Sequence, residues 1–219
     1  MQKFSFLIPA SLLTASGKVF YSGRTAFGST SKLYILGLNP GGSPEEEASE
    51  TVGGHTEKVL TGPADWSAYR DEGWRGLAPG ADKMQHRVLH LLCRLNFEPG
   101  QTPASIVVFA RSPRGADIKS RFVRLAPLCW PFHQRVIEQL GVRVVLCLGN
   151  DAGDWVCNQL KARLHVGEFV ESNERRWRST AFINSNGIAI VIATHPSIAD
   201  WTKSATDPTP LLQRMLARD

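Results

Sequence analysis

Four short apolar runs constrain the fold of this chain more than any other feature. Each run is rich in Val, Ile and Leu with little polar alternation, which is typical of strands covered on both faces. Segments with helical periodicity separate the runs, and this alternation predicts an α/β fold. We expect a central, mostly parallel, four-stranded sheet flanked by helices in three layers, with strands at residues 33–38, 105–110, 142–148 and 188–193.

Helices are expected between and after these strands, at residues 81–97, 131–140, 151–164 and 209–217. Pro131 is placed to open the second helix and Asp151 to cap the third. The Asn186-Gly187 pair is a strong hairpin signal, so residues 180–184 are expected to pair antiparallel with 188–193. Residues 43–80 are rich in Gly and Pro and predict a long functional or mobile loop.

The bulk composition indicates one ordinary globular domain spanning residues 1–219. The chain has 219 residues, of which 42% are hydrophobic and 21% are charged. No apolar run approaches the ~20 residues of a membrane helix. Residues 1–18 resemble a signal peptide, but Ser5 and Pro9 interrupt the apolar stretch and no cleavage box follows, so we expect mature structure there.

The four cysteines give no sign of a metal centre or a disulfide framework. No pair has C-x-x-C spacing, and no His neighbours them at zinc spacing. Cys93 and Cys147 lie in apolar segments and are expected to be core thiols. We therefore expect a cytoplasmic monomer that needs no metal or cofactor.

The basic residues are clustered, which favours a polyanionic partner. The formal net charge is +5 and the isoelectric point is about 9.2. A solvated basic surface explains the total charge equally well, so the clustering carries the argument. One cluster has Trp177 interleaved among its arginines, a pattern that suits a nucleic-acid backbone. The clustered cations are Arg111, Arg114, Lys119, Arg121 and Arg124, with Arg175, Arg176 and Arg178 further along the chain.

Polar and glycine residues follow each predicted strand at its carboxyl end. In open α/β sheets, ligands bind outside the carboxyl ends of the strands. The first strand is followed by Asn39 and the last by His195, with Arg111 and Gly149 after the other two. Alone, the Asn-Pro-Gly-Gly stretch reads more often as a turn, and a single His reads more often as a structural residue. Their joint placement favours a site.

Two motifs in this order resemble the uracil-DNA glycosylase superfamily. The first is the strand followed by Gly-Leu-Asn-Pro-Gly at residues 37–41, and the second is His-Pro-Ser at residues 195–197. The strand ending in Leu-Gly at residues 148–149 is also similar, and the resemblance spans residues 33–201. An Asn at the first motif resembles the mismatch-specific and single-strand-selective branches.

The resemblance implies hydrolysis of the bond between a damaged or deaminated base and deoxyribose in DNA. Asn39 would orient a water, and His195 would donate a hydrogen bond to the leaving base. Ile198 would be the wedge that enters the duplex, although packing under the loop is an equal alternative. Arg111 is expected to bind phosphate. Substrate contacts are expected from Gly37, Leu38, Pro40, Gly41, Gly42, Arg111, Pro196, Ser197 and Ile198.

The chain also departs from the family pattern. The aromatic expected soon after the first motif is replaced by Ser43-Pro44-Glu45, so Trp66, Tyr69 or Trp74 would have to stack on the base. The base-reading Asn of the second strand is missing as well. Two other function classes stay open: a non-catalytic nucleic-acid-binding protein that keeps the fold, and an enzyme acting on a free nucleoside or nucleotide.

Overall fold

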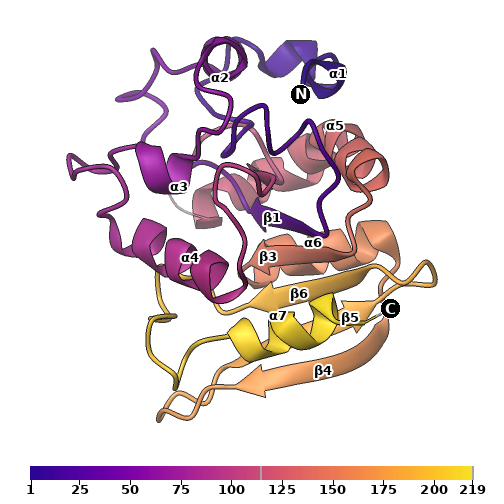
Figure 1. Cartoon of the computed structure of the whole chain (residues 1–219). Helices are drawn as coiled ribbons and strands as arrows, with labels where there is room; N and C mark the ends of the chain where they lie inside the picture. The colour runs from indigo at the N-terminus through magenta and orange to yellow at the C-terminus, as the bar shows by residue number, and fades with distance from the viewer. Residues whose placement is uncertain (114, 219) are drawn as a thin grey trace.

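One six-stranded sheet organises the structure. The structure is a computed structural model that describes residues 1–113 and 115–218 (Figure 1). The strand order is β2-β1-β3-β6-β5-β4. The strands are β1 (Leu33–Gly37), β2 (Ala104–Ile106), β3 (Val144–Leu148), β4 (Leu164–Val170), β5 (Arg178–Ile183) and β6 (Ala189–Ala193). The helices are α1 (Gln2–Ser5), the 3-10 helix η1 (Ala10–Leu12), α2 (Val52–Thr61), α3 (Ala68–Asp71), α4 (Lys83–Arg94), α5 (Gly115–Leu140), α6 (Asn150–Leu160) and α7 (Thr209–Leu216).

The α/β class is confirmed, but the prediction of four strands is wrong because the sheet has six. Strands β2, β1, β3 and β6 are parallel to their neighbours and form the expected core, but β2 ends at Ile106, so the prediction of a strand through residue 110 is wrong. Strand β5 pairs antiparallel with β6, as the Asn186-Gly187 turn predicted. Strand β4, which pairs antiparallel with β5, was not expected.

Helices cover both faces of the sheet, which gives three layers. In β1 the side chains alternate between the two faces. Tyr34 and Leu36 pack in an apolar cluster with residues of α5 and α6. Leu33 and Ile35 pack in a second cluster with residues of α4 and α7. The parallel strands are therefore buried on both sides, which explains their continuous apolar sequences.

Several local expectations are wrong for identifiable reasons. Helix α5 runs through Pro127 and Pro131, so Pro131 does not open a helix. Gly149 rather than Asp151 is the N-cap of α6, and Asp151 lies in its first turn, where a carboxylate favours the helix dipole. The region at 43–80 contains α2 and α3. Cys147 is buried as expected, but Cys93 is exposed, and all four cysteines are free. In the described part of the chain, no helix is long and apolar enough to cross a membrane.

An N-terminal segment, residues 16–22, runs along the outer side of the β2 region. It forms antiparallel bridges from Gly17 to Ala110 and from Phe20 to Ser105. Backbone hydrogen bonds accompany them, among them Tyr21 N–H to the Ala104 carbonyl at 2.9 Å. The chain after β2 also continues beside the end of β1, because Val107 N–H donates to the Gly37 carbonyl at 2.8 Å. These contacts fix the backbone on which the first motif is carried.

Helix α6 lies so close to β6 that Gly153 has no room for a side chain. A Cβ at this position would lie 2.5 Å from Cγ1 and 2.6 Å from Cγ2 of Ile192. We predict that Gly153→Ala lowers the free energy of unfolding by about 1–3 kcal/mol, because the helix must move away from the strand. Chemical denaturation measures this loss.

The matched control is Asp154→Ala, at an exposed position of the same helix. We expect that change to stay within about 0.5 kcal/mol of the parent chain. Equal stability of the two variants would contradict the close packing of α6 on β6.

Candidate active site

The loops that carry Asn39 and His195 leave the sheet at the same edge and at the same level. Strand register pairs Leu36 with Cys147, and Leu148 with Ala193. The last residues of β1 and β6, Gly37 and Ala193, therefore lie at the same level of the sheet. Asn39 and His195 each follow two positions after these strand ends. Strand β3 lies between β1 and β6, so the two loops are separated by two strand spacings, about 10 Å. Two groups at this separation bracket a ligand rather than contact each other.

Asn39 is held by its amide nitrogen. Its Nδ2 atom donates to the Ser112 hydroxyl at 2.9 Å and to the Pro40 carbonyl at 2.8 Å. The Pro40 carbonyl also accepts from Ser112 N–H at 3.1 Å, which ties the two loops together. Among the described residues, the amide oxygen of Asn39 has no hydrogen-bond partner. The side chain is therefore fixed in place with an acceptor left to orient a small polar molecule.

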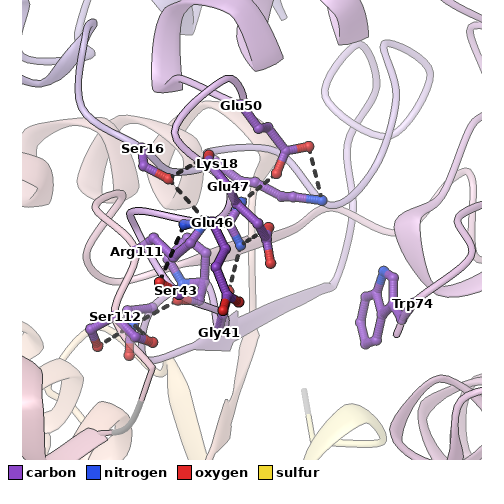
Figure 2. Close-up of polar contacts among 12 residues, drawn as sticks. Ser16, Lys18, Gly41, Ser43, Glu46, Glu47, Glu50, Trp74, Arg111 and Ser112 are labelled. Atoms are coloured by element: carbon purple, nitrogen blue, oxygen red, sulfur yellow. Dashed lines mark hydrogen bonds and ion pairs between the residues drawn. The ribbon is translucent and has the colours of Figure 1, made fainter. Parts of the chain in front are cut away.

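The glycines after Pro40 allow a close approach of charged side chains (Figure 2). Gly42 has a φ of +99°, and a Cβ there would lie 2.2 Å from the Glu47 Oε1 atom. Gly41 is exposed, and its carbonyl accepts a hydrogen bond from Arg111. A side chain at position 42 would therefore disturb both the turn and the ion pairs behind it.

Arg111 lies inside the protein and binds the chain's own carboxylates. It is 3% exposed, and it pairs with Glu50 and with Glu47, the latter at 2.6 Å. Its Nε atom donates to the Ser16 hydroxyl at 3.1 Å. Figure 2 shows the guanidinium surrounded by these groups. The guanidinium donors bind groups of the chain itself, so Arg111 holds the first motif loop in place. This geometry does not support the expected contact between Arg111 and phosphate.

The other cations of the first basic cluster are either exposed or outside the described residues. Arg121 and Arg124 are exposed on α5. Arg114 and the side chain of Lys119 lie outside the described residues.

His195 is held as a neutral hydrogen-bond donor. Ser197 N–H donates to His195 Nδ1 at 3.1 Å, and the Ser197 hydroxyl lies 2.7 Å from the same atom. Burial lowers the pKa of His195 to about 4, so the ring is neutral near pH 7. A backbone N–H only donates, so Nδ1 is the acceptor and the single ring proton is on Nε2. Gly149, whose φ is +92°, lies directly against this ring.

The loop after His195 is braced from two sides. Arg87 of α4 donates to the Pro196 carbonyl at 2.6 Å and pairs with Asp200 at 3.3 Å. The Trp201 indole donates to the Thr194 carbonyl at 3.0 Å. Pro196 is buried, whereas Ile198 is 54% exposed. Ile198 is therefore not packed under the loop.

The second basic cluster lies beside this loop. Arg175 donates to the Ile198 carbonyl at 3.4 Å and pairs with Glu171 at 3.0 Å. Its guanidinium lies 4.5 Å from the centroid of the Trp177 ring, a stacked cation–π contact. Trp177 is 42% exposed. An apolar side chain, a cation and an indole thus stand together on the surface next to His195.

The three candidate stacking aromatics are all engaged elsewhere. Tyr69 is 2% exposed, and its ring centroid lies 5.7 Å from that of Trp74. The Trp74 indole donates to Glu72 at 2.9 Å. Trp66 packs against the buried ring of His55, with centroids 6.2 Å apart. In the part of the chain that the structure describes, no contact joins these rings to Asn39 or His195.

A hollow of about 220 Å³ adjoins the first motif on the α5 and α6 side. Neither Asn39 nor His195 is among the described residues that line it, so this hollow is not a cavity shared by the two motifs. Its lining residues are Leu38, Ile118, Phe122, Asp151, Asp154, Trp155 and Asn158.

Most of the residues that support the two motif loops have no signal in the sequence. Ser112, Glu47 and Arg87 hold the motif loops, yet none belongs to a recognisable local pattern. Only Arg175 had a signal, because it lies in the basic stretch around Trp177.

A scan against protein-family models finds no match to this chain, and a search of curated proteins finds no similar sequence.

The lowered pKa of His195 predicts a specific pH dependence. The unfolded chain binds a proton at this residue near pH 6.5, whereas the folded chain does so only near pH 4. The free energy of unfolding should therefore fall as the pH drops from 6.5 to 4, by up to about 1.4 kcal/mol per pH unit from this residue. Denaturation of the parent chain and of His195→Gln across this range measures the difference.

Proton NMR of the His195 ring gives an independent reading of the same pKa. A midpoint near 6.5, or identical pH profiles of stability in the two chains, would show that the ring is not held neutral.

Proposed function

We propose that the protein is a DNA glycosylase that removes uracil or another deaminated or damaged base. The observation that carries this proposal is the neutral His195 with its Nε2–H donor, on a loop two strands away from Asn39 at one sheet edge. The resemblance of both loops to the uracil-DNA glycosylase motifs supports the same function.

The two side chains suit the two halves of the reaction. Breaking the bond between base and deoxyribose leaves negative charge on the base oxygens. The Nε2–H of His195 can stabilise that charge, and because the ring is already neutral it does so without a change in protonation. The oxygen of Asn39 can hold the attacking water. An amide is a weak base, so the reaction should be slower than with a carboxylate at this position.

Access to the base requires that the nucleotide leaves the helical stack. The exposed Ile198 is suited to enter the vacated space, since apolar wedges separate base steps. Arg175 and Trp177, beside it, are suited to contact phosphate and an unstacked base. Exposed Arg121 and Arg124 add positive charge on α5, the helix that follows the Ser112 loop.

The choice of base rests on backbone groups more than on a dedicated side chain. The Ser105 hydroxyl, at the position after the start of β2, donates to the Val19 carbonyl at 2.6 Å and is buried. Arg111 is paired with carboxylates. The exposed backbone at Gly41 is the part of the first motif loop best able to approach a base edge. We therefore propose a base class rather than a single base.

The proposal predicts base release that depends on both motif residues. Oligonucleotides that each carry one modified base are incubated with the protein and scored for abasic sites. We expect Asn39→Ala and His195→Ala each to lower the rate by about 10²–10³-fold, because each removes one group that acts in the transition state.

The control is His165→Ala, at an exposed position on β4 far along the sheet from β1. This variant should keep the parent rate, and thermal unfolding confirms that all three variants are folded. Base release that persists unchanged in both motif variants would refute the assigned roles.

One observation favours a second candidate, a non-catalytic nucleic-acid-binding protein with this fold. The candidate stacking rings Trp66, Tyr69 and Trp74 are engaged away from Asn39. This alternative expects binding of DNA that weakens steeply with salt, with no abasic product from any oligonucleotide. Competition by mononucleotides as strong as that by oligonucleotides would instead point to an enzyme of free nucleosides.

A further inference from the structure

Three potential metal ligands converge behind the first motif loop, and Asn39 and His195 are not among them. A carboxylate oxygen of Glu50, a ring nitrogen of His55 and a carboxylate oxygen of Glu72 all lie within 4.8 Å of one another. Glu50 precedes α2, His55 lies inside α2, and Glu72 follows α3. The cluster therefore joins two separate parts of the region between residues 43 and 80.

His55 is buried without the hydrogen bonds that a buried imidazole needs. It is 2% exposed, and among the described residues neither of its ring nitrogens has a hydrogen-bond partner. One of these nitrogens lies within 4.8 Å of both carboxylate oxygens. An imidazole nitrogen without a hydrogen-bond partner can offer its lone pair to a metal ion.

Each carboxylate of the cluster is oriented by a second group. Glu50 uses its Oε2 atom to pair with Arg111, and its Oε1 atom faces the Lys18 ammonium (Figure 2). Glu72 accepts a hydrogen bond from the Trp74 indole at its Oε2 atom, at 2.9 Å. Partners of this kind fix the direction of ligands in metal sites.

A cationic group already lies between the carboxylates. The Lys18 ammonium is 3.3 Å from Glu50 Oε1 and 3.0 Å from Glu72 Oε2. Two cations, Lys18 and Arg111, face three carboxylates, those of Glu47, Glu50 and Glu72. The ammonium is engaged by Glu50 and by both oxygens of Glu72, and it makes no hydrogen bond to His55. A divalent ion that displaced it would balance these charges and would also give His55 a partner.

We propose that Glu50, His55 and Glu72 form a structural site for one divalent ion of the first transition row, such as Zn²⁺ or Mn²⁺. One imidazole with two carboxylates is a ligand set suited to these ions. Donor atoms bound at about 2.1 Å to one ion lie at most about 4.2 Å apart, so the side chains need to move by less than about 1 Å. The ion would connect the segment before α2 to the segment after α3 and so stiffen the support of Arg111 and Gly41.

Calorimetric titration of the tag-free, chelator-treated chain with Zn²⁺ and with Mn²⁺ tests this site. We expect one ion per chain and a thermal midpoint that rises with metal concentration. Nitrogen-15 spectra of the histidine rings should show the His55 signals move while those of exposed His165 stay. These readouts do not depend on base release, so the metal site and the glycosylase proposal fail or stand separately.

Three variants and one control sharpen the test. His55→Gln and Glu72→Gln should each weaken binding by at least about tenfold, the range seen for groups that support a metal site. His165→Gln should bind as the parent does, and Lys18→Met should bind more tightly because its competing ammonium is gone. If His55→Gln does not fold, Glu72→Gln decides.

The proposal is overturned by any of three results. The first is the absence of stoichiometric binding of either ion to the parent chain. Binding by Lys18→Met alone counts as this result, because the Lys18 ammonium would then occupy the site in the parent chain and exclude the ion. The second is equal affinity in the parent chain and the ligand variants. The third is metal-induced shifts of the His165 signals rather than those of His55.

Discussion

The candidate site depends on the ion pairs and hydrogen bonds of the buried Arg111 guanidinium. The guanidinium joins three segments that are far apart in sequence: Ser16, the glycine turn after Asn39, and the acidic stretch containing Glu47 and Glu50. A buried cation is stable only when its donors are satisfied, so the turn and the acidic stretch have to fold together around it. The orientation of Asn39 follows, because Ser112, the next residue after Arg111, holds the amide.

The two halves of the candidate site are built by different means. Asn39 is placed by ion pairs and by the loop after β2, whereas His195 is placed by local hydrogen bonds to Ser197 and by close contact with Gly149. The sheet brings them together because parallel strands in register end at one level. The sheet thus fixes the spacing of the two loops at two strand spacings, about 10 Å.

The sequence predicted those parts of the structure that depend on local pattern. Strands β1, β3 and β6 are continuous apolar runs, and β5 was marked by the Asn186-Gly187 turn. Strand β4 was missed because it is an edge strand whose exposed Leu164 and interior Gly167 blur the pattern. Both motif loops were predicted at the correct sheet edge. The pairing of Arg111 with Glu47 and Glu50, and the meeting of His55 with Glu72, were not predicted, since contacts between distant segments leave no trace in spacing.

The N-terminal segment 16–22 has a consequence for the integrity of the sheet. By lying along β2 it satisfies backbone groups that would otherwise face solvent, and it carries Lys18 into the acidic cluster. A chain shortened past residue 22 would keep every motif residue and yet present a bare, apolar strand edge, which is a template for pairing with other chains. Proteolytic trimming at this end would therefore favour pairing between chains and make the protein prone to aggregation.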